Sequence, residues 1–268
     1  KNTASDNTAV GCGALICNTT GFQNTGIGAL ALDANTTSSN NTAVGWCTLS
    51  SNTTGEQNTA LGSCALKSAT EANYNIAIGS DALACTLTGA CNIAIGKAAL
   101  KSNTASGNVA VGCAALECNT SGAFNVAVGL DALTANTTAD NNTAVGYRAL
   151  LSNTTSGSNT AVGVEALCAN QTGVNNTAVG QVALKKITTN NNTAVGVQAA
   201  ACTTSGYATA VGYKAMKANT TSSGNTAMGF EAMRSVTTGG NNTAFGLYSL
   251  CDLNTAVGNT AVGRQAFQ

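Results

Sequence analysis

Residues 142–150 read Asn-Thr-Ala-Val-Gly-Tyr-Arg-Ala-Leu, and residues 159–167 repeat the pattern as Asn-Thr-Ala-Val-Gly-Val-Glu-Ala-Leu. The five residues that end in glycine recur, with substitutions, sixteen times in the 268-residue chain. Twelve of the fifteen intervals between these glycines are 17 residues and three are 16, which indicates stacked units of one kind rather than one globular core. The repeating glycines are Gly11, Gly28, Gly45, Gly62, Gly79, Gly96, Gly112, Gly129, Gly146, Gly163, Gly180, Gly196, Gly212, Gly229, Gly246 and Gly263.

The composition argues against several classes of function. The chain has no histidine, so Cys-His and Ser-His-Asp catalytic arrangements are impossible, and we expect no enzyme activity. Its acidic residues are scattered, so we expect no metal site and no cofactor. Charged residues make up 8% of the chain and the net charge is zero, which disfavours nucleic-acid binding. No apolar run reaches the roughly 18 residues of a spanning helix, so we expect no membrane insertion.

The repeat is typical of one coil of a β-solenoid. Seventeen residues are too few for a helical hairpin, and β-branched residues alternate before each motif glycine. The Ala-Leu pair predicts a second short strand, and glycine and Asn-Thr-Thr supply the corners. The sequence therefore predicts an all-β, parallel β-solenoid (β-roll) of about 16 coils with two short strands per coil. We expect one domain over residues 1–268 that is a fragment of a longer fibre.

The alternation also predicts which side chains face inward. The Thr position accepts Ile76 and Ile93, and the Val position is never polar, so we place both inside the coil with the Leu that follows. A buried Val or Leu contributes about 1.5–3 kcal/mol, so many stacked layers could hold the protein together. The predicted structural core is Val145, Leu150, Val162, Leu167, Val179 and Leu184.

The opposite face of the first strand carries alanine. This position is Ala in fifteen of sixteen repeats, and a solvated face has no reason to exclude longer side chains. We interpret it as a contact with another surface, bordered by apolar residues directly after the motif glycines. The alternative is that a tightly curved coil leaves no room for more than a methyl group. The predicted interface is Ala144, Ala161, Ala178, Leu130, Tyr147, Val164, Tyr213 and Phe230.

Three further patterns bear on the stacking. Asparagine recurs at two positions per repeat, where stacked amides could form ladders of hydrogen bonds. Lys214 and Glu231 occupy the same position in neighbouring repeats, so in-register stacking would pair their charges. The eleven cysteines lie at scattered positions, and most should be free thiols. Cys47 and Cys64 share a position in adjacent repeats and are the one candidate pair for a disulfide.

The repeat over residues 142–150 and 159–167 resembles those of phage tail-fibre-like proteins. The Asn-Ile-Ala-Ile-Gly stretches at residues 75–79 and 92–96 are similar to repeats in the heads of trimeric autotransporter adhesins. The resemblance covers nearly the whole chain. It implies a left-handed parallel β-roll, assembled as a trimer and used as an attachment fibre or stalk.

Two functions from different classes remain open. The first is a rigid structural rod, part of an extracellular or virion attachment fibre, either a tail fibre or at the cell surface. Its partners would be other copies, as a homotrimer or bundled fibre, and a host-surface glycan or receptor. The second is a module that binds ice or glycan through rows of Thr and Asn, of which Thr19, Thr36 and Thr53 form one. Those threonines lie at a turn, whereas an ice-binding face would be flat and on a strand.

Overall fold

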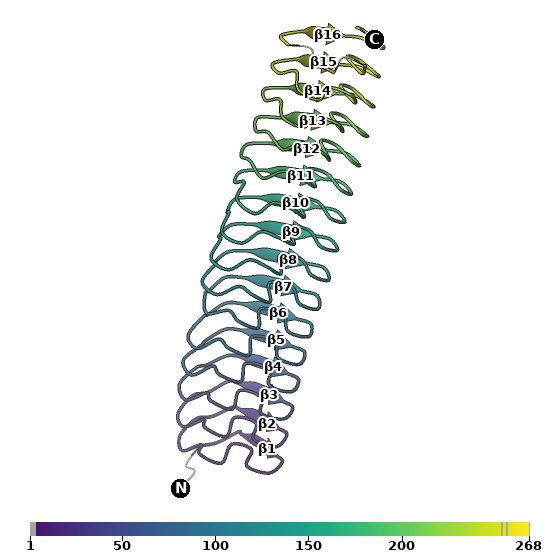
Figure 1. Cartoon of the computed structure of the whole chain (residues 1–268). Helices are drawn as coiled ribbons and strands as arrows, with labels where there is room; N and C mark the ends of the chain where they lie inside the picture. The colour runs from purple at the N-terminus through teal and green to yellow at the C-terminus, as the bar shows by residue number, and fades with distance from the viewer. Residues whose placement is uncertain (1–3, 253, 256, 268) are drawn as a thin grey trace. The chain divides into compact units, whose positions relative to one another are not determined.

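The computed structural model describes residues 4–252, 254–255 and 257–267, and the predicted all-β parallel β-solenoid is confirmed (Figure 1). The chain forms two compact units, residues 1–138 and residues 139–268. Each unit contains eight three-residue strands, one per coil, and no helix occurs among the described residues. The ends of the predicted single domain, residues 1–3 and 268, lie outside the described part.

In the first unit the strands are β1 (Thr8–Val10), β2 (Thr25–Ile27), β3 (Thr42–Val44), β4 (Thr59–Leu61), β5 (Ile76–Ile78), β6 (Ile93–Ile95), β7 (Val109–Val111) and β8 (Val126–Val128). In the second unit they are β9 (Thr143–Val145), β10 (Thr160–Val162), β11 (Thr177–Val179), β12 (Thr193–Val195), β13 (Thr209–Val211), β14 (Thr226–Met228), β15 (Thr243–Phe245) and β16 (Thr260–Val262).

Within each unit the strands are parallel and in register. Each residue of β10 pairs with its equivalent in β11, as Thr160 does with Thr177 and Val162 with Val179. The amide of Gly163 donates to the carbonyl of Val145 at 2.8 Å, one coil earlier. The period of 16 or 17 residues is therefore the length of one complete coil, and equivalent side chains lie one strand spacing apart, about 4.8 Å.

The prediction of a second strand per coil is wrong. The segment after each motif glycine is a succession of turns in which alternate residues are left-handed, as at Glu165 (φ 54°) and Leu167 (φ 52°). This alternation turns successive amides toward opposite neighbours: Glu165 donates to the carbonyl of Tyr147 at 2.9 Å, and Leu167 donates to that of Ala183 at 3.0 Å. The left-handed conformation costs a non-glycine residue about 1–2 kcal/mol, and bonds to both neighbouring coils offset that cost.

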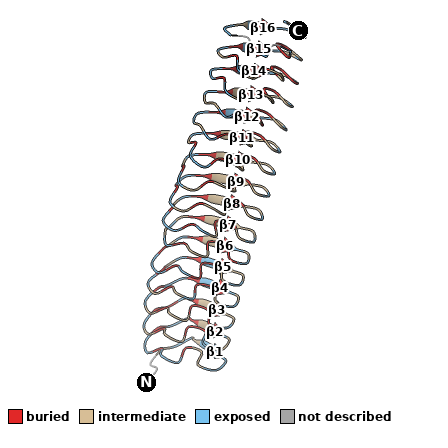
Figure 2. Ribbon diagram, viewed as in Figure 1, coloured by how far each residue is buried: buried red, intermediate tan, exposed pale blue. Residues whose placement is uncertain are grey.

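The interior of the coil differs from the prediction on the strand and agrees with it at the leucines. Ala144, Ala161 and Ala178 have no exposed surface, whereas Val145, Val162 and Val179 are partly exposed, so the inside and outside of the strand are inverted (Figure 2). Leu150, Leu167 and Leu184 are fully buried, as predicted.

The coil is too thin for a larger side chain at the alanine position. Gly26 occupies this position in β2, and a methyl group added there would lie 3.4 Å from Leu15 Cγ and 3.3 Å from the carbonyl oxygen of Ala31. A single Cβ at this position thus already reaches van der Waals contact with the opposite side of the coil. The uniform alanine reflects a lack of space inside the coil, which was the alternative interpretation of the sequence.

Two buried rows of asparagine form the predicted ladders. At the start of each strand, the amide of Asn176 donates to the side-chain oxygen of Asn159 at 3.0 Å, and the amide of Asn192 donates to that of Asn176 at 2.9 Å. The Asn176 side-chain nitrogen donates to the carbonyl of Thr189 at 2.8 Å. In the second row, Asn35 donates to Asn18 Oδ1 at 2.9 Å. These bonds join neighbouring coils at both corners and satisfy polar groups that would otherwise be buried without partners.

Candidate functional site

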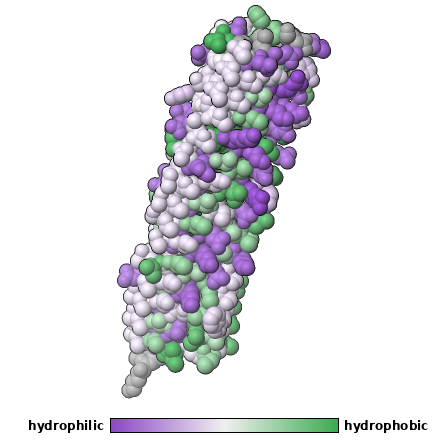
Figure 3. All heavy atoms as spheres, viewed as in Figure 1, coloured by the Kyte–Doolittle hydropathy of each residue, from purple (hydrophilic) through white to green (hydrophobic). Residues whose placement is uncertain are grey.

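The surface feature that repeats most regularly is the outer face of the strands. We call the first and third residues of each strand the strand face; in strands β2–β16 the central residue is buried in the coil. Across both units its positions are occupied only by Thr, Val, Ile, Leu, Met and Phe, and never by a charged residue. The strand face is therefore an uncharged surface on which residues repeat at a fixed spacing. Elsewhere on the surface, hydrophilic residues are scattered among neutral and hydrophobic ones (Figure 3).

The two units differ in the chemistry of this face. In the first unit, strands β5–β8 carry Ile or Val at both outer positions. In the second unit, all eight strands begin with Thr. The first unit thus presents a fully aliphatic patch, and the second presents an unbroken column of hydroxyl groups.

The threonines of the turns and of the strands differ in their hydrogen bonds. The turn threonines donate their hydroxyls to carbonyls of the next coil, as Thr19 does to Thr36 at 2.9 Å and Thr172 to Thr188 at 3.0 Å. The strand threonines of the second unit, from Thr143 to Thr260, make no hydroxyl bond to any described protein group. The row that includes Thr19, Thr36 and Thr53 therefore joins coils, whereas the strand hydroxyls are free to bind a ligand.

The predicted apolar border residues are exposed in both units: Leu130 in the first unit is 48% exposed. In the second unit Tyr147, Val164, Tyr213 and Phe230 follow motif glycines and are between 37% and 42% exposed, and we call these four residues the ridge. In the second unit the Tyr213 and Phe230 rings stack with centroids 5.1 Å apart, and Lys214 Nζ lies 4.8 Å from the Tyr213 centroid. Tyr213 therefore contacts both the adjacent Lys214 and an aromatic ring of the next coil. A role for the ridge in an interface stays a prediction.

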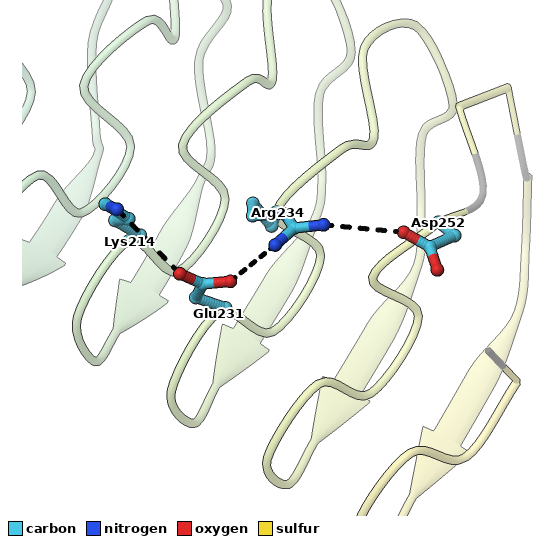
Figure 4. A network of polar contacts seen from close by, with 4 residues as sticks. All are labelled: Lys214, Glu231, Arg234 and Asp252. Atoms are coloured by element: carbon cyan, nitrogen blue, oxygen red, sulfur yellow. Dashed lines mark hydrogen bonds and ion pairs between the residues drawn. The ribbon is translucent and has the colours of Figure 1, made fainter.

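An ion network lies beside the ridge (Figure 4). Glu231 is 3.9 Å from Lys214 and 2.6 Å from Arg234, and Arg234 is 3.6 Å from Asp252. The Lys214–Glu231 pair confirms that charges at equivalent positions face each other in neighbouring coils. The hydrogen bond to Glu231 raises the pKa of Arg234. Glu231 is buried, but Lys214, Arg234 and Asp252 are partly exposed to solvent, which screens their charges, so these pairs contribute little to stability.

A second ion pair also joins side chains of neighbouring coils. Lys185 Nζ lies 2.8 Å from Glu165 Oε2, one coil away. This hydrogen bond lowers the pKa of the Glu165 carboxyl and raises that of Lys185. Both pKa shifts favour the charged forms at neutral pH, as expected for a pair that helps to hold adjacent coils.

All eleven cysteines are free thiols. Cys47 is buried and its Sγ lies 3.5 Å from Ser50 Oγ, while Cys64 is half-buried with its Sγ 3.8 Å from Ser63 Oγ. The candidate pair Cys47 and Cys64 is therefore unbridged.

Among the described residues no three His, Cys, Asp or Glu side chains converge to hold a metal ion. No cavity or cleft occurs in the described part of the chain.

Comparison with protein-family models and with curated proteins gave no match. Over residues 4–252, 254–255 and 257–267 there is no helix of the length and hydrophobicity needed to cross a membrane. The candidate functional surfaces are accordingly the strand face and the ridge.

Proposed function

We propose that this chain is a structural, non-catalytic segment of an attachment fibre, extracellular or on a virion. The observation that carries the proposal is the continuity of bonding from coil to coil. Backbone amides, both asparagine rows and the turn threonines all bond to a neighbouring coil, as at Asn176, Asn35 and Thr172. A repeat stabilised in this way depends on its immediate neighbours and can be extended by adding coils, which suits a spacer.

The location is tested by immunogold electron microscopy of the source cells and of virus particles released from them, with an antibody raised against the purified chain. We expect gold along fibres at the cell surface or on virions. Label confined to the cell interior, with none on fibres, would contradict the proposal. Pre-immune serum from the same animal is the control.

We further propose that the partner in this fibre is another copy, packed against the aliphatic part of the strand face. Strands β5–β8 expose eight β-branched residues in two in-register columns. A surface corrugated every ~4.8 Å is complementary to another of the same period, which a second copy provides. Burying aliphatic area contributes roughly 25 cal/mol per Å², with no charge to desolvate. The alanines of the predicted interface, Ala144, Ala161 and Ala178, cannot take part, because they lie inside the coil.

Replacing Ile93 and Val109 together by Lys should lower the oligomeric mass. Both side chains point outward, so the coil should stay folded while two charges separate the faces. Sedimentation equilibrium measures the mass, and circular dichroism checks the fold. The matched control replaces Cys118 and Ser121, both exposed on a turn of the same unit, by Lys and should keep the parent mass. A monomeric parent, or a strand variant with unchanged mass, would refute this interface.

A further inference from the structure

We propose that the strand face of the second unit binds ice. This face consists of the first and third residues of strands β9–β16 and is called here the Thr face. The first position is Thr in all eight strands, and the third is Val in six of them, with Met228 and Phe245 in β14 and β15. The Thr face is a different surface from the one proposed for self-association, and neither proposal depends on the other.

The geometry of the Thr face is a two-dimensional grid. Neighbouring strands pair residue for residue, so successive threonines are about 4.8 Å apart and the Thr and Val of one strand are roughly 6.6 Å apart. Both residue types are β-branched and have stiff χ1 angles, so the positions of their methyl and hydroxyl groups are well fixed. Strands β9–β13 carry Thr and Val without exception, which gives ten such side chains in regular order.

The chemistry of the face fits ordered water better than other ligands. The strand hydroxyls bind no described protein group, so they are available as donors and acceptors. The methyl groups beside them restrict the orientation of first-shell water. No charged side chain lies on the face to impose its own hydration shell. An ice surface has the same qualities: it is uncharged, periodic in two dimensions and made only of hydrogen-bonding groups.

Two other occupants fit less well. A glycan needs polar groups that converge on one ring or a concave site, and these hydroxyls stand in a straight row with no cavity beside them. A second copy would bury the threonine column, and each hydroxyl would then lose water and need a new partner. The aliphatic strands β5–β8 have no such requirement. Because the threonine hydroxyls need hydrogen-bonding partners and the aliphatic residues of β5–β8 do not, ordered water is the ligand that fits the Thr face best.

The affinity would come from many weak contacts made together. One threonine bound to one water contributes little, but a rigid row engages the lattice at every coil once one coil is bound. Interrupting the grid in its middle should therefore reduce binding by much more than the share of the residues replaced. This requirement for continuity distinguishes a lattice ligand from a small molecule held by one or two coils.

The test compares ice-growth inhibition by the full chain and by two double variants. Thr160→Lys with Thr177→Lys interrupts the grid in β10 and β11. Thr155→Lys with Gln171→Lys places the same charges on exposed turns of the same coils. Thermal hysteresis and ice recrystallisation are measured at equal concentration, after circular dichroism has shown equal melting temperatures. We expect activity in the parent and in the turn variant, and at least a tenfold loss in the grid variant.

A parent without thermal hysteresis would overturn the proposal, as would a grid variant that keeps full activity. Sedimentation of the grid variant provides a separate check. If its mass falls below that of the parent, a second copy covers the Thr face and the proposal fails. Thr160→Val with Thr177→Val removes only the hydroxyls and should reduce activity less than lysine does. These results leave the location of the fibre, and the mass of the Ile93 and Val109 variant, unaffected.

Discussion

Replacing Ala161 by Lys should unfold several coils of the second unit. Ala161 has no exposed surface and is flanked in register by Ala144 and Ala178, which are equally buried. At the equivalent position of β2, one methyl group already reaches ordinary contact distance from Leu15 and Ala31. A lysine there combines overpacking with a buried, unpaired charge. We expect a loss of about 4 kcal/mol or more in the free energy of unfolding.

The control for this prediction lies on the same strand. Val162→Lys adds the same side chain one residue later, where the native valine is partly exposed, and should cost less than about 1 kcal/mol. Urea unfolding followed by circular dichroism measures both variants. Equal stabilities would mean that the inward face has been assigned wrongly. A large loss at Val162 with none at Ala161 would restore the inside and outside first predicted from the sequence.

The features that depend on the period could be predicted from the sequence alone. The recurrence of glycine every 16 or 17 residues specifies parallel, in-register coils, and the register follows without knowledge of the corners. The asparagine ladders and the pairing of Lys214 with Glu231 were predictable for the same reason, since any residue that recurs once per coil stacks on itself. These predictions needed no knowledge of the shape of the coil.

The features that depend on the cross-section could not be predicted. A three-residue strand offers two opposite assignments of its faces, and a shift by one residue exchanges them completely. Hydrophobicity favours Val162 inside, but the space inside the coil admits only Ala161. The decisive signal is the near-invariance of alanine, which is compatible in the sequence both with an external contact and with a lack of space inside the coil. The turns at Glu165 and Leu167 were missed because non-glycine residues seldom adopt the left-handed conformation.

Correcting the faces changes where function is sought. With Thr and Val outside, the variable part of the repeat is the outer surface, and substitutions there change what the coil presents without altering its interior. Strands β5–β8 present aliphatic residues and strands β9–β16 present threonine, on the same backbone. One fold can therefore carry a contact for another copy in one unit and a hydrated face in the other.

Replacing Gly163 by Ala should also be strongly destabilising, although it adds one carbon. Gly163 has φ +135°, which side-chain-bearing residues rarely adopt. An added Cβ would lie 2.6 Å from the carbonyl carbon of Gly180 and 2.7 Å from its oxygen, both in the backbone of the next coil. Neither can move without breaking the pairing of β10 with β11, so we expect a loss of about 3 kcal/mol or more.

Gly263→Ala separates the two causes. Gly263 is a motif glycine of the same unit with φ +122°, and an added Cβ would meet no atom within 4 Å, so this variant carries a conformational penalty of about 1–3 kcal/mol without a clash. Urea unfolding should rank the parent first, Gly263→Ala second and Gly163→Ala last. If the two variants proved equally stable, close packing of glycine on glycine would not be the reason for the period. The motif glycine would then be retained for its backbone conformation alone.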